Sequence, residues 1–382
     1  MKIVQIVPYY PPHLGGMENV VKEMSENLAK RGHQVKVFTS DIGCKNVKLK
    51  STKNLKINWL LGWEFSHSPI LPSLFFKLIR IPKDSIMHVH IAQAFVPEIV
   101  FLVSKLRGIS YIAHIHLDVG PSTKMGFLLP FYKKVFLQKV LSSSSKIIVP
   151  TKDYIDLVSK KYTISKNKIY KIPCGVDLKN FQSLSGKSHD LIRLLFVGRL
   201  SIQKNVPLLI RSFKKITEKN LRNIELHIVG DGKEKSKIIN LIKAEKLEKK
   251  VILHGALRGK RLYKIFSNSD IFILTSRLES FGIVLIEAMA SGLPIVVSNI
   301  PAVRNVVENG KTGLLVKPSP EHFAKAIEKL LNNSQLRKKL IKNGLEEAKK
   351  YNWDKIVEKY EDVYQNVKEA KINKNDINNN YR

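Results

Sequence analysis

Short apolar runs that alternate with amphipathic stretches constrain the fold of this chain more than any other feature. In the first half, the runs that read as strands are 2–7, 34–39, 85–90, 110–116 and 146–149. The segment 17–31 places Val20, Met24 and Leu28 on one helical face. Strands that alternate with helices predict a parallel sheet with helices on both faces.

The alternation starts again after the polar, serine-bearing segment 182–190. Further strands are expected at 194–197, 226–229, 251–253, 271–274 and 295–297. A length of 382 residues favours two domains. We therefore expect an α/β protein with two doubly wound, Rossmann-like domains, 1–180 and 191–352, facing each other across a cleft, with a linker at 181–190. A helix at 353–368 is expected to pack back toward the N-terminal domain, and the polar tail 369–382 is expected to be disordered.

The composition bounds the environment and the partners. The formal net charge is +33, from 65 Lys and Arg against 32 acidic residues. Such a charge suits nucleic acid, an anionic membrane or phosphorylated substrates, or it reflects a lysine-rich surface without that role. Cys44 and Cys174 form no disulfide framework or thiolate metal site, which fits a reducing compartment. No run approaches the ~18 apolar residues of a membrane span. We expect a cytoplasmic protein, with attachment to the inner face of the cell membrane left open.

Two glutamates eight positions apart, Glu279 and Glu287, give the strongest chemical signal. An expected strand precedes them, and 283–289 reads as a helix. Glu279 then lies on the strand-to-helix loop and Glu287 about one turn into the helix. The loop opens where ligands bind in such sheets, and the amides of Phe281, Gly282 and Ile283 would point there. This arrangement suits a diphosphate and a polyol together, the combination found in a nucleotide sugar.

Two other loops carry groups that suit the same ligand. Arg199 and Lys204 follow the expected strand 194–197 and could neutralise a departing diphosphate, although two solvated surface cations are the alternative. Gly15 and Gly16 follow the first strand, where a backbone could approach a phosphate or sugar closely. A tight strand-to-helix turn is the alternative for this pair, which lacks a full dinucleotide-binding fingerprint.

Histidines gather at the ends of two expected strands. His116 stands at the end of 110–116, where it could hydrogen-bond a sugar hydroxyl or transfer a proton. His88, His90 and His114 are interpreted as polar residues that cap strand ends. No zinc-ligand spacing occurs, and no Asp-x-Asp offers a carboxylate seat for magnesium. No metal or other cofactor is therefore expected.

The basic segment 124–141 combines Phe and Leu with lysines and contains no acidic residue. Such a segment can lie on an anionic membrane as an amphipathic helix. The alternative is an ordinary crossover helix whose apolar face packs on the sheet. Both interpretations stay open at this point.

The ordered motifs resemble glycosyltransferase family four, the group 1 retaining transferases of the GT-B fold. The resemblance runs from Met1 to about Tyr364 and is carried by 197–200 (VGRL), 230–232 (GDG), 279–282 (ESFG) and 287–294 (EAMASGLP), with support from 173–177 and 309–313. Cys174 departs from the usual asparagine of the linker motif, which bears on turn chemistry.

The resemblance implies a role for each matching position. Glu287 would hold the ribose hydroxyls and Glu279 the transferred sugar. Arg199 and Lys204 would neutralise the diphosphate, Gly16 would be the close-approach glycine, and His116 the donor-side histidine. The remaining donor-binding positions expected in these motifs are Gly15, Gly198, Ser280, Phe281, Gly282 and Ile283.

The expected function is that of a retaining, metal-independent hexosyltransferase. It would move a sugar from a UDP- or GDP-linked donor to an acceptor hydroxyl of a glycan or lipid-linked acceptor, in cell-surface glycan or glycolipid synthesis. A GT-B sugar-nucleotide epimerase or a phosphorylase is the alternative among enzymes. A basic nucleic-acid-binding protein is a further alternative, although no recognition-helix signature supports specific nucleic-acid binding.

Overall fold

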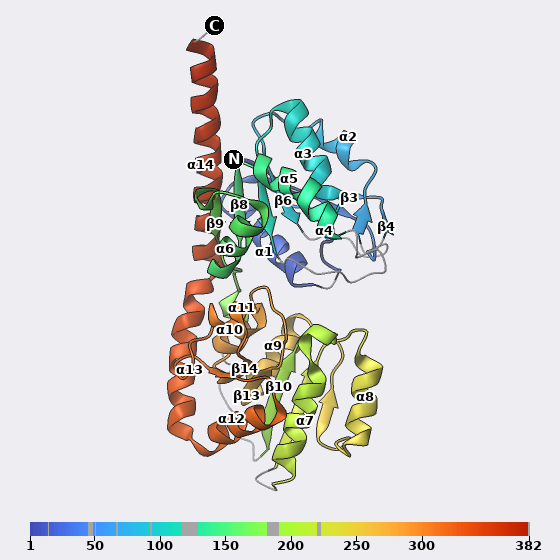
Figure 1. The fold of residues 1–382 in the computed structure, drawn as a ribbon, viewed down its shortest axis with the longest axis vertical. Coiled ribbons are helices and arrows are strands. Elements are labelled where there is room, and N and C mark those ends of the chain that lie inside the picture. The colour runs from blue at the N-terminus through green and yellow to red at the C-terminus, as the bar shows by residue number, and fades with distance from the viewer. Residues whose placement is uncertain are drawn as a thin grey trace. The chain divides into compact units, whose positions relative to one another are not determined.

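The computed structural model describes residues 1–13, 15–44, 49, 51–65, 68–91, 94–116, 129–181, 191–219 and 223–380. These residues form two compact units (Figure 1). The first unit combines Met1–Gly175 with Trp353–Arg382, and the second is Val176–Asn352. Each unit is built around its own parallel sheet with helices, as expected for a doubly wound α/β protein.

The chain passes from the first unit to the second earlier than expected. Val176 donates its amide hydrogen to the carbonyl of Tyr351 at 2.8 Å, and the ring of Phe181 packs against Phe266. Residues 176–181 are thereby held on the second unit. Of the expected linker 181–190, residues 182–190 lie outside the described residues.

The first unit contains a seven-stranded sheet in the order β3-β2-β1-β6-β7-β8-β9, in which every pair is parallel. Its strands are β1 (Lys2–Ile6), β2 (Gln34–Ser40), β3 (Leu55–Leu60), β6 (Ile86–Ile91), β7 (Tyr111–Ile115), β8 (Lys146–Val149) and β9 (Ile169–Lys171), with a separate hairpin of β4 (Trp63–Phe65) and β5 (Ser68–Ile70). Its helices are α1 (Gly16–Lys30), α2 (Leu74–Leu78), α3 (Val96–Arg107), α4 (Leu129–Tyr132), a π-helical turn (Lys133–Leu137), α5 (Gln138–Ser143), α6 (Lys152–Tyr162), a 3-10 turn (Lys166–Lys168) and α14 (Trp353–Asn380).

Helix α14 returns the end of the chain to the first unit, where it packs against α1 and β6. Trp353 lies so close to Gly175 that a β-carbon there would come within 2.5 Å of the indole. Tyr360 and Tyr364 are fully buried. The segment 369–382, expected to be disordered, instead continues the helix as far as Asn380. A helix already nucleated by buried residues gains one hydrogen bond for each residue added, which favours this extension.

The second unit contains a six-stranded parallel sheet in the order β12-β11-β10-β13-β14-β15. Its strands are β10 (Ile192–Val197), β11 (Ile224–Val229), β12 (Val251–Leu253), β13 (Ile271–Leu274), β14 (Ile295–Ser298) and β15 (Leu314–Val316). Its helices are α7 (Val206–Thr217), α8 (Lys235–Ala244), α9 (Gly259–Ser267), α10 (Ile283–Ala290), α11 (Pro301–Arg304), α12 (Pro320–Asn332) and α13 (Ser334–Ala348), with 3-10 turns at Leu178–Asn180, Ile202–Lys204 and Lys349–Tyr351.

The strand order of the second unit places a switch point between β10 and β13. Successive strands are added outward on one side, from β10 to β12, and then on the other, from β13 to β15. The loops after β10 and β13 therefore lead to different sides of the sheet and leave room for a ligand at its carboxyl edge. Among the described residues, no helix is both long and apolar enough to cross a membrane.

The loop after β11 touches the loop after β10 so closely that only glycine fits. Gly230 has φ +144°, and a β-carbon there would lie 1.9 Å from the carbonyl oxygen of Gly198.

We expect Gly230→Ala to lower the free energy of unfolding by roughly 2–5 kcal/mol, from backbone strain and steric overlap together. Gly255→Ala is the matched control, because Gly255 also has a positive φ (+66°) but has nothing within 4 Å of the added carbon. It should cost roughly 1–2 kcal/mol. Urea denaturation of both variants measures the difference, and equal losses would contradict the close approach.

Candidate functional site

The loops after β10 and β13 are joined by an ion pair at the switch point. Lys204 Nζ lies 2.6 Å from Glu279 Oε1, and the side chains are 20% and 8% exposed. The Ser276 hydroxyl donates to the same carboxylate oxygen, also at 2.6 Å. An ion pair so far withdrawn from water must be held by further hydrogen bonds, which Ser276 supplies. The sequence motifs assign Lys204 to the diphosphate and Glu279 to the transferred sugar. In the structure the two side chains are in direct contact.

Two further contacts fix these loops. The Thr275 hydroxyl lies 3.1 Å from the carbonyl of Lys204 and 3.0 Å from that of Asn205, so that it donates to this pair of acceptors. The amide of Arg277 donates to the carbonyl of Gln203 at 2.7 Å. Sequence reasoning missed Thr275 and Ser276, although small hydroxyl residues directly after a buried strand are a usable signal for loop-bridging hydrogen bonds.

The first turn of α10 presents amides at the same edge. Gly282 precedes the helix with φ +86°, a left-handed conformation that favours glycine. Phe281 is buried against the ring of Tyr351, which anchors the loop. The amides at the start of a helix have no acceptor within the helix, and its dipole is positive there. Ser280 and Ile283 flank this turn and are partly exposed.

Glu287 lies one turn further along α10 and is partly buried. Burial raises the pKa of its carboxyl to about 7. Across the switch point, the amide of Gly198 donates to the carbonyl of Val229, on the neighbouring strand β11, at 3.0 Å. Arg199 follows β10 and is exposed. The second unit therefore gathers two cations, two carboxylates and a helix N-terminus around the ends of β10 and β13.

In the first unit, Gly15 and Gly16 lie where β1 leads into α1. Gly15 is extended and precedes the helix, and a β-carbon there would lie 2.0 Å from the Glu18 carboxylate. Glu18 is buried and pairs with His13 at 2.9 Å, while His13 stacks on Tyr9. The glycine thus leaves room for the folded-back carboxylate of its own helix, which would have to move aside for a larger residue. Sequence reasoning missed Glu18 and His13.

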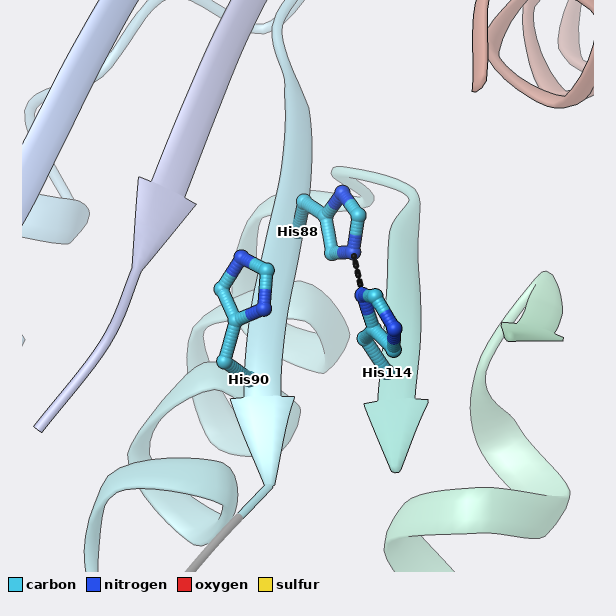
Figure 2. A group of neighbouring side chains, drawn as sticks. All are labelled: His88, His90 and His114. Carbon is cyan, nitrogen blue, oxygen red and sulfur yellow. Dashed lines mark hydrogen bonds between the residues drawn. The ribbon is translucent and has the colours of Figure 1, made fainter. Parts of the chain in front are cut away.

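His116 follows β7 and joins a cluster of buried histidines. His90 Nδ1 lies 2.8 Å from His116 Nε2, and His88 Nε2 lies 3.2 Å from His114 Nδ1. The interpretation of His88, His90 and His114 as strand-end caps is wrong, because all three are buried within the sheet (Figure 2). Tyrosines of α14 cover this face of the sheet. The pattern of strands in the sequence does not predict that this distant helix packs there.

Burial lowers the pKa of every histidine in the cluster. The pKa falls to about 3 for His88 and His116, and well below the ordinary value for His90 and His114. Neighbouring imidazoles add to this effect by disfavouring a second positive charge. All four rings are therefore neutral at neutral pH, each with one N–H donor and one acceptor nitrogen.

Comparisons with known proteins agree on one family. The model of glycosyl transferases group 1 matches residues 179–347, and that of glycosyltransferase family 4 matches residues 14–180. An uncharacterised glycosyltransferase of Methanocaldococcus jannaschii is 27% identical, over 95% of this chain and 98% of the relative. A phosphatidylinositol N-acetylglucosaminyltransferase component from Arabidopsis thaliana is 24% identical, over 95% of this chain and 81% of its own.

A solved structure shares the fold. Anabaena HepE in complex with UDP and glucose superposes with a TM-score of 0.76 at 16% identity, covering 96% of this chain and all of the other. The fold is GT-B, as the sequence motifs imply.

Acidification is expected to destabilise the protein through the histidine cluster. Below pH ~6.5 the unfolded histidines take up protons that the folded ones do not accept until about pH 3. Stability is therefore complete above pH ~6.5 and falls as the pH drops, by roughly 1.4 kcal/mol per pH unit for each histidine. Glu287 has the opposite effect on stability. Because its pKa is raised to about 7 in the folded protein, the folded state binds up to about one proton more than the unfolded state at this site as the pH falls below 7.

Urea denaturation at pH 7, 6 and 5 measures this loss. His114→Asn is first checked for cooperative unfolding at pH 8. In this variant the free energy of unfolding should fall less steeply with pH, by the contribution of about one proton. Ile147→Val offers the control, because it alters a buried side chain of the neighbouring strand β8 without removing a titratable group, and it should leave the pH dependence unchanged. Wild-type stability that stays constant from pH 7 to pH 5 would contradict the cluster's neutrality.

Proposed function

This chain belongs to glycosyltransferase family 4, and from that membership we propose that it transfers a sugar from a UDP- or GDP-linked donor to an acceptor hydroxyl with retention of anomeric configuration. The observation that carries the proposal is the Lys204–Glu279 ion pair at the switch point, beside Arg199 and the N-terminus of α10. UDP and glucose in the solved complex of HepE support a uridine donor as the first choice to test.

The leaving group is a diphosphate, and cations and helix amides of the second unit stabilise its negative charge. As the bond between the anomeric carbon and the phosphate oxygen breaks, negative charge grows on that oxygen and the sugar becomes cationic. Arg199, Lys204 and the first amides of α10 stabilise the charge on the diphosphate. Lys204 is already oriented by Glu279 before the donor arrives, so little reorganisation accompanies the reaction.

The acceptor hydroxyl attacks from the same face as the leaving group. Its oxygen forms the new bond to the anomeric carbon, and its proton passes to the departing phosphate oxygen. This front-face course retains the configuration without a covalent nucleophile on the enzyme. In this proposal Glu279 holds a hydroxyl of the transferred sugar, and His116 hydrogen-bonds a substrate hydroxyl.

Glu287 suits the recognition of a diol. With a pKa near 7, its carboxyl is close to half ionised at neutral pH. Two hydroxyls that donate to the carboxylate favour the ionised form and lower this pKa. Ribose offers such a pair, and the position one turn inside α10 keeps it close to the helix N-terminus that would hold the diphosphate.

Removal of either cation should depress transfer while the protein stays folded. We expect Arg199→Met and Lys204→Met to lower kcat by roughly 10²–10³-fold, by analogy with the loss of one preorganised donor to a developing charge. Lys219→Met is the matched control, because Lys219 also pairs with a glutamate, Glu328, but lies just beyond the C-terminal end of α7, whereas Lys204 precedes its N-terminal end.

Transfer is assayed with UDP- and GDP-linked hexoses, and binding is measured separately by thermal shift. A donor present at 100 times its Kd should stabilise the native protein by roughly 2.7 kcal/mol. Analysis of the product's anomeric configuration tests retention. If both variants fold and transfer at the wild-type rate, the leaving-group role is excluded. If no nucleotide sugar stabilises the wild type, the donor class is wrong.

We also propose that the acceptor is presented at an anionic membrane surface. The segment 129–143 leaves Phe131 and Phe136 63% and 48% exposed beside the exposed lysines Lys134 and Lys139, with no acidic residue. Aromatic rings enter the lipid interface while lysines meet anionic head groups. A relative whose name specifies phosphatidylinositol supports a lipid-linked acceptor.

Vesicle sedimentation tests this surface. The wild type should bind vesicles that contain phosphatidylglycerol and release from them at high salt, whereas Phe131→Ser with Phe136→Ser should bind about tenfold more weakly, a loss of ~1.4 kcal/mol. Leu345→Ser, an exposed apolar side chain on α13, serves as the control. Equal binding by all three proteins would exclude this segment as the contact.

A further inference from the structure

Three neighbouring strands of the first unit place polar side chains on one buried face. Gln5 on β1 lies opposite His88 on β6, and His90 lies opposite His114 on β7. Because side chains alternate along a strand, His88 and His90 share this face. All four side chains are at most 1% exposed. Figure 2 shows the three histidines on their two strands.

The geometry of the rings argues for hydrogen bonding over metal binding. Nitrogens of His88, His90 and His114 come within 4.8 Å of one another, close enough to suggest three metal ligands. An imidazole lone pair lies in the plane of its ring, however, and the rings of His88 and His90 are stacked with planes 16° apart. Lone pairs that lie in two nearly parallel, stacked planes cannot both point at one ion 2.0–2.1 Å from each nitrogen. The inward nitrogens are also already hydrogen-bonded.

Those hydrogen bonds form one continuous network that includes a tyrosine of α14. Gln5 Nε2 donates to the Tyr364 hydroxyl oxygen at 3.1 Å, and that hydroxyl lies 2.6 Å from His88 Nδ1. On its other side, Gln5 Oε1 lies 2.8 Å from His90 Nε2. The last link joins His90 Nδ1 to His116 Nε2 at 2.8 Å.

The proton positions in this network follow from counting donors. An amide oxygen only accepts, so His90 must carry its proton on Nε2. A neutral ring has one proton, which leaves His90 Nδ1 as an acceptor. His116 must then donate through its own Nε2, and its Nδ1 is left without a proton, as an acceptor. Tyr364 supports this direction by accepting the hydrogen bond from Gln5 Nε2, which leaves the amide oxygen of Gln5 facing His90.

We propose that Tyr364 and Gln5 are positioning residues that fix the tautomer of His116, so that Nδ1 of His116 accepts a hydrogen bond from a substrate hydroxyl. His116 is the one histidine of the four that is partly exposed, and so the one that a ligand can reach. The part played by the substrate rests on the proposed function, whereas the tautomer itself does not.

The chain provides a closely matched pair of variants. Tyr364→Phe removes the hydroxyl that orients Gln5, so that the amide can rotate and both tautomers of His90 and His116 become populated. Tyr360→Phe removes a hydroxyl from the same buried face of α14, where Tyr360 meets His88 and His114 through ring contacts. Gln5→Met removes both ends of the amide and should act like Tyr364→Phe.

Histidine-selective ¹⁵N NMR on the ligand-free, full-length protein at pH 7 reads the tautomers directly, with His116→Gln used to assign the His116 signals. The wild type and Tyr360→Phe should show His116 protonated only at Nε2. Tyr364→Phe and Gln5→Met should show a mixture. A wild-type His116 protonated at Nδ1, or a His116 tautomer unmoved by either substitution, overturns the proposal.

Transfer assays then test the consequence. In Tyr364→Phe, kcat should fall in proportion to the fraction of molecules that keep the Nε2–H form, about twofold for an even mixture, while KM for the donor is unchanged. A tautomer that shifts without any change in kcat overturns the substrate contact. If the wild type transfers no sugar, the proposed function fails, and the NMR result still decides the tautomer.

Discussion

The adjacency of β10 and β13 is the constraint on which the chemistry of the second unit depends. These strands are neighbours in the sheet, although three helices and two strands separate them in the sequence. Their loops leave the same edge and are tied together by Thr275 and by the Lys204–Glu279 pair. The proposed transfer from a diphosphate donor would need cations fixed before the charge develops. The sheet order brings the loop that carries Arg199 and Lys204 to Glu279 and the N-terminus of α10, and the hydrogen bonds between the loops hold them there.

Sequence reasoning succeeded where local pattern and topology agree. The apolar run 194–197 lies inside β10, and the placement of Lys204 near Glu279 follows from two loops at one sheet edge. It failed at β3, where Lys56 and Asn58 interrupt the apolar pattern of an edge strand. It also failed for His88, which lies in the middle of β6 and is covered by Tyr360 and Tyr364 of the distant helix α14.

The first unit illustrates why the remaining features escaped prediction. A carboxylate of its own helix folds back over Gly15, a side-chain arrangement that no spacing rule conveys. The domain boundary likewise depends on two individual contacts, the amide of Val176 on Tyr351 and the ring of Phe181 on Phe266. Motif order identified the family, but the hydrogen-bond directions around His116 required coordinates.

The return of α14 to the first unit has a consequence for biosynthesis. Synthesis runs from the N-terminus, and domains ordinarily fold in that order as they emerge from the ribosome. Here the sheet of the first unit lacks the tyrosines that cover its histidine face until Tyr360 and Tyr364 of α14 have been made, after the whole of the second unit. The second unit, by contrast, has its whole sequence available earlier. The first unit is therefore begun before the second and completed after it, and a nascent chain that stops short of Tyr360 would leave its imidazoles open to water.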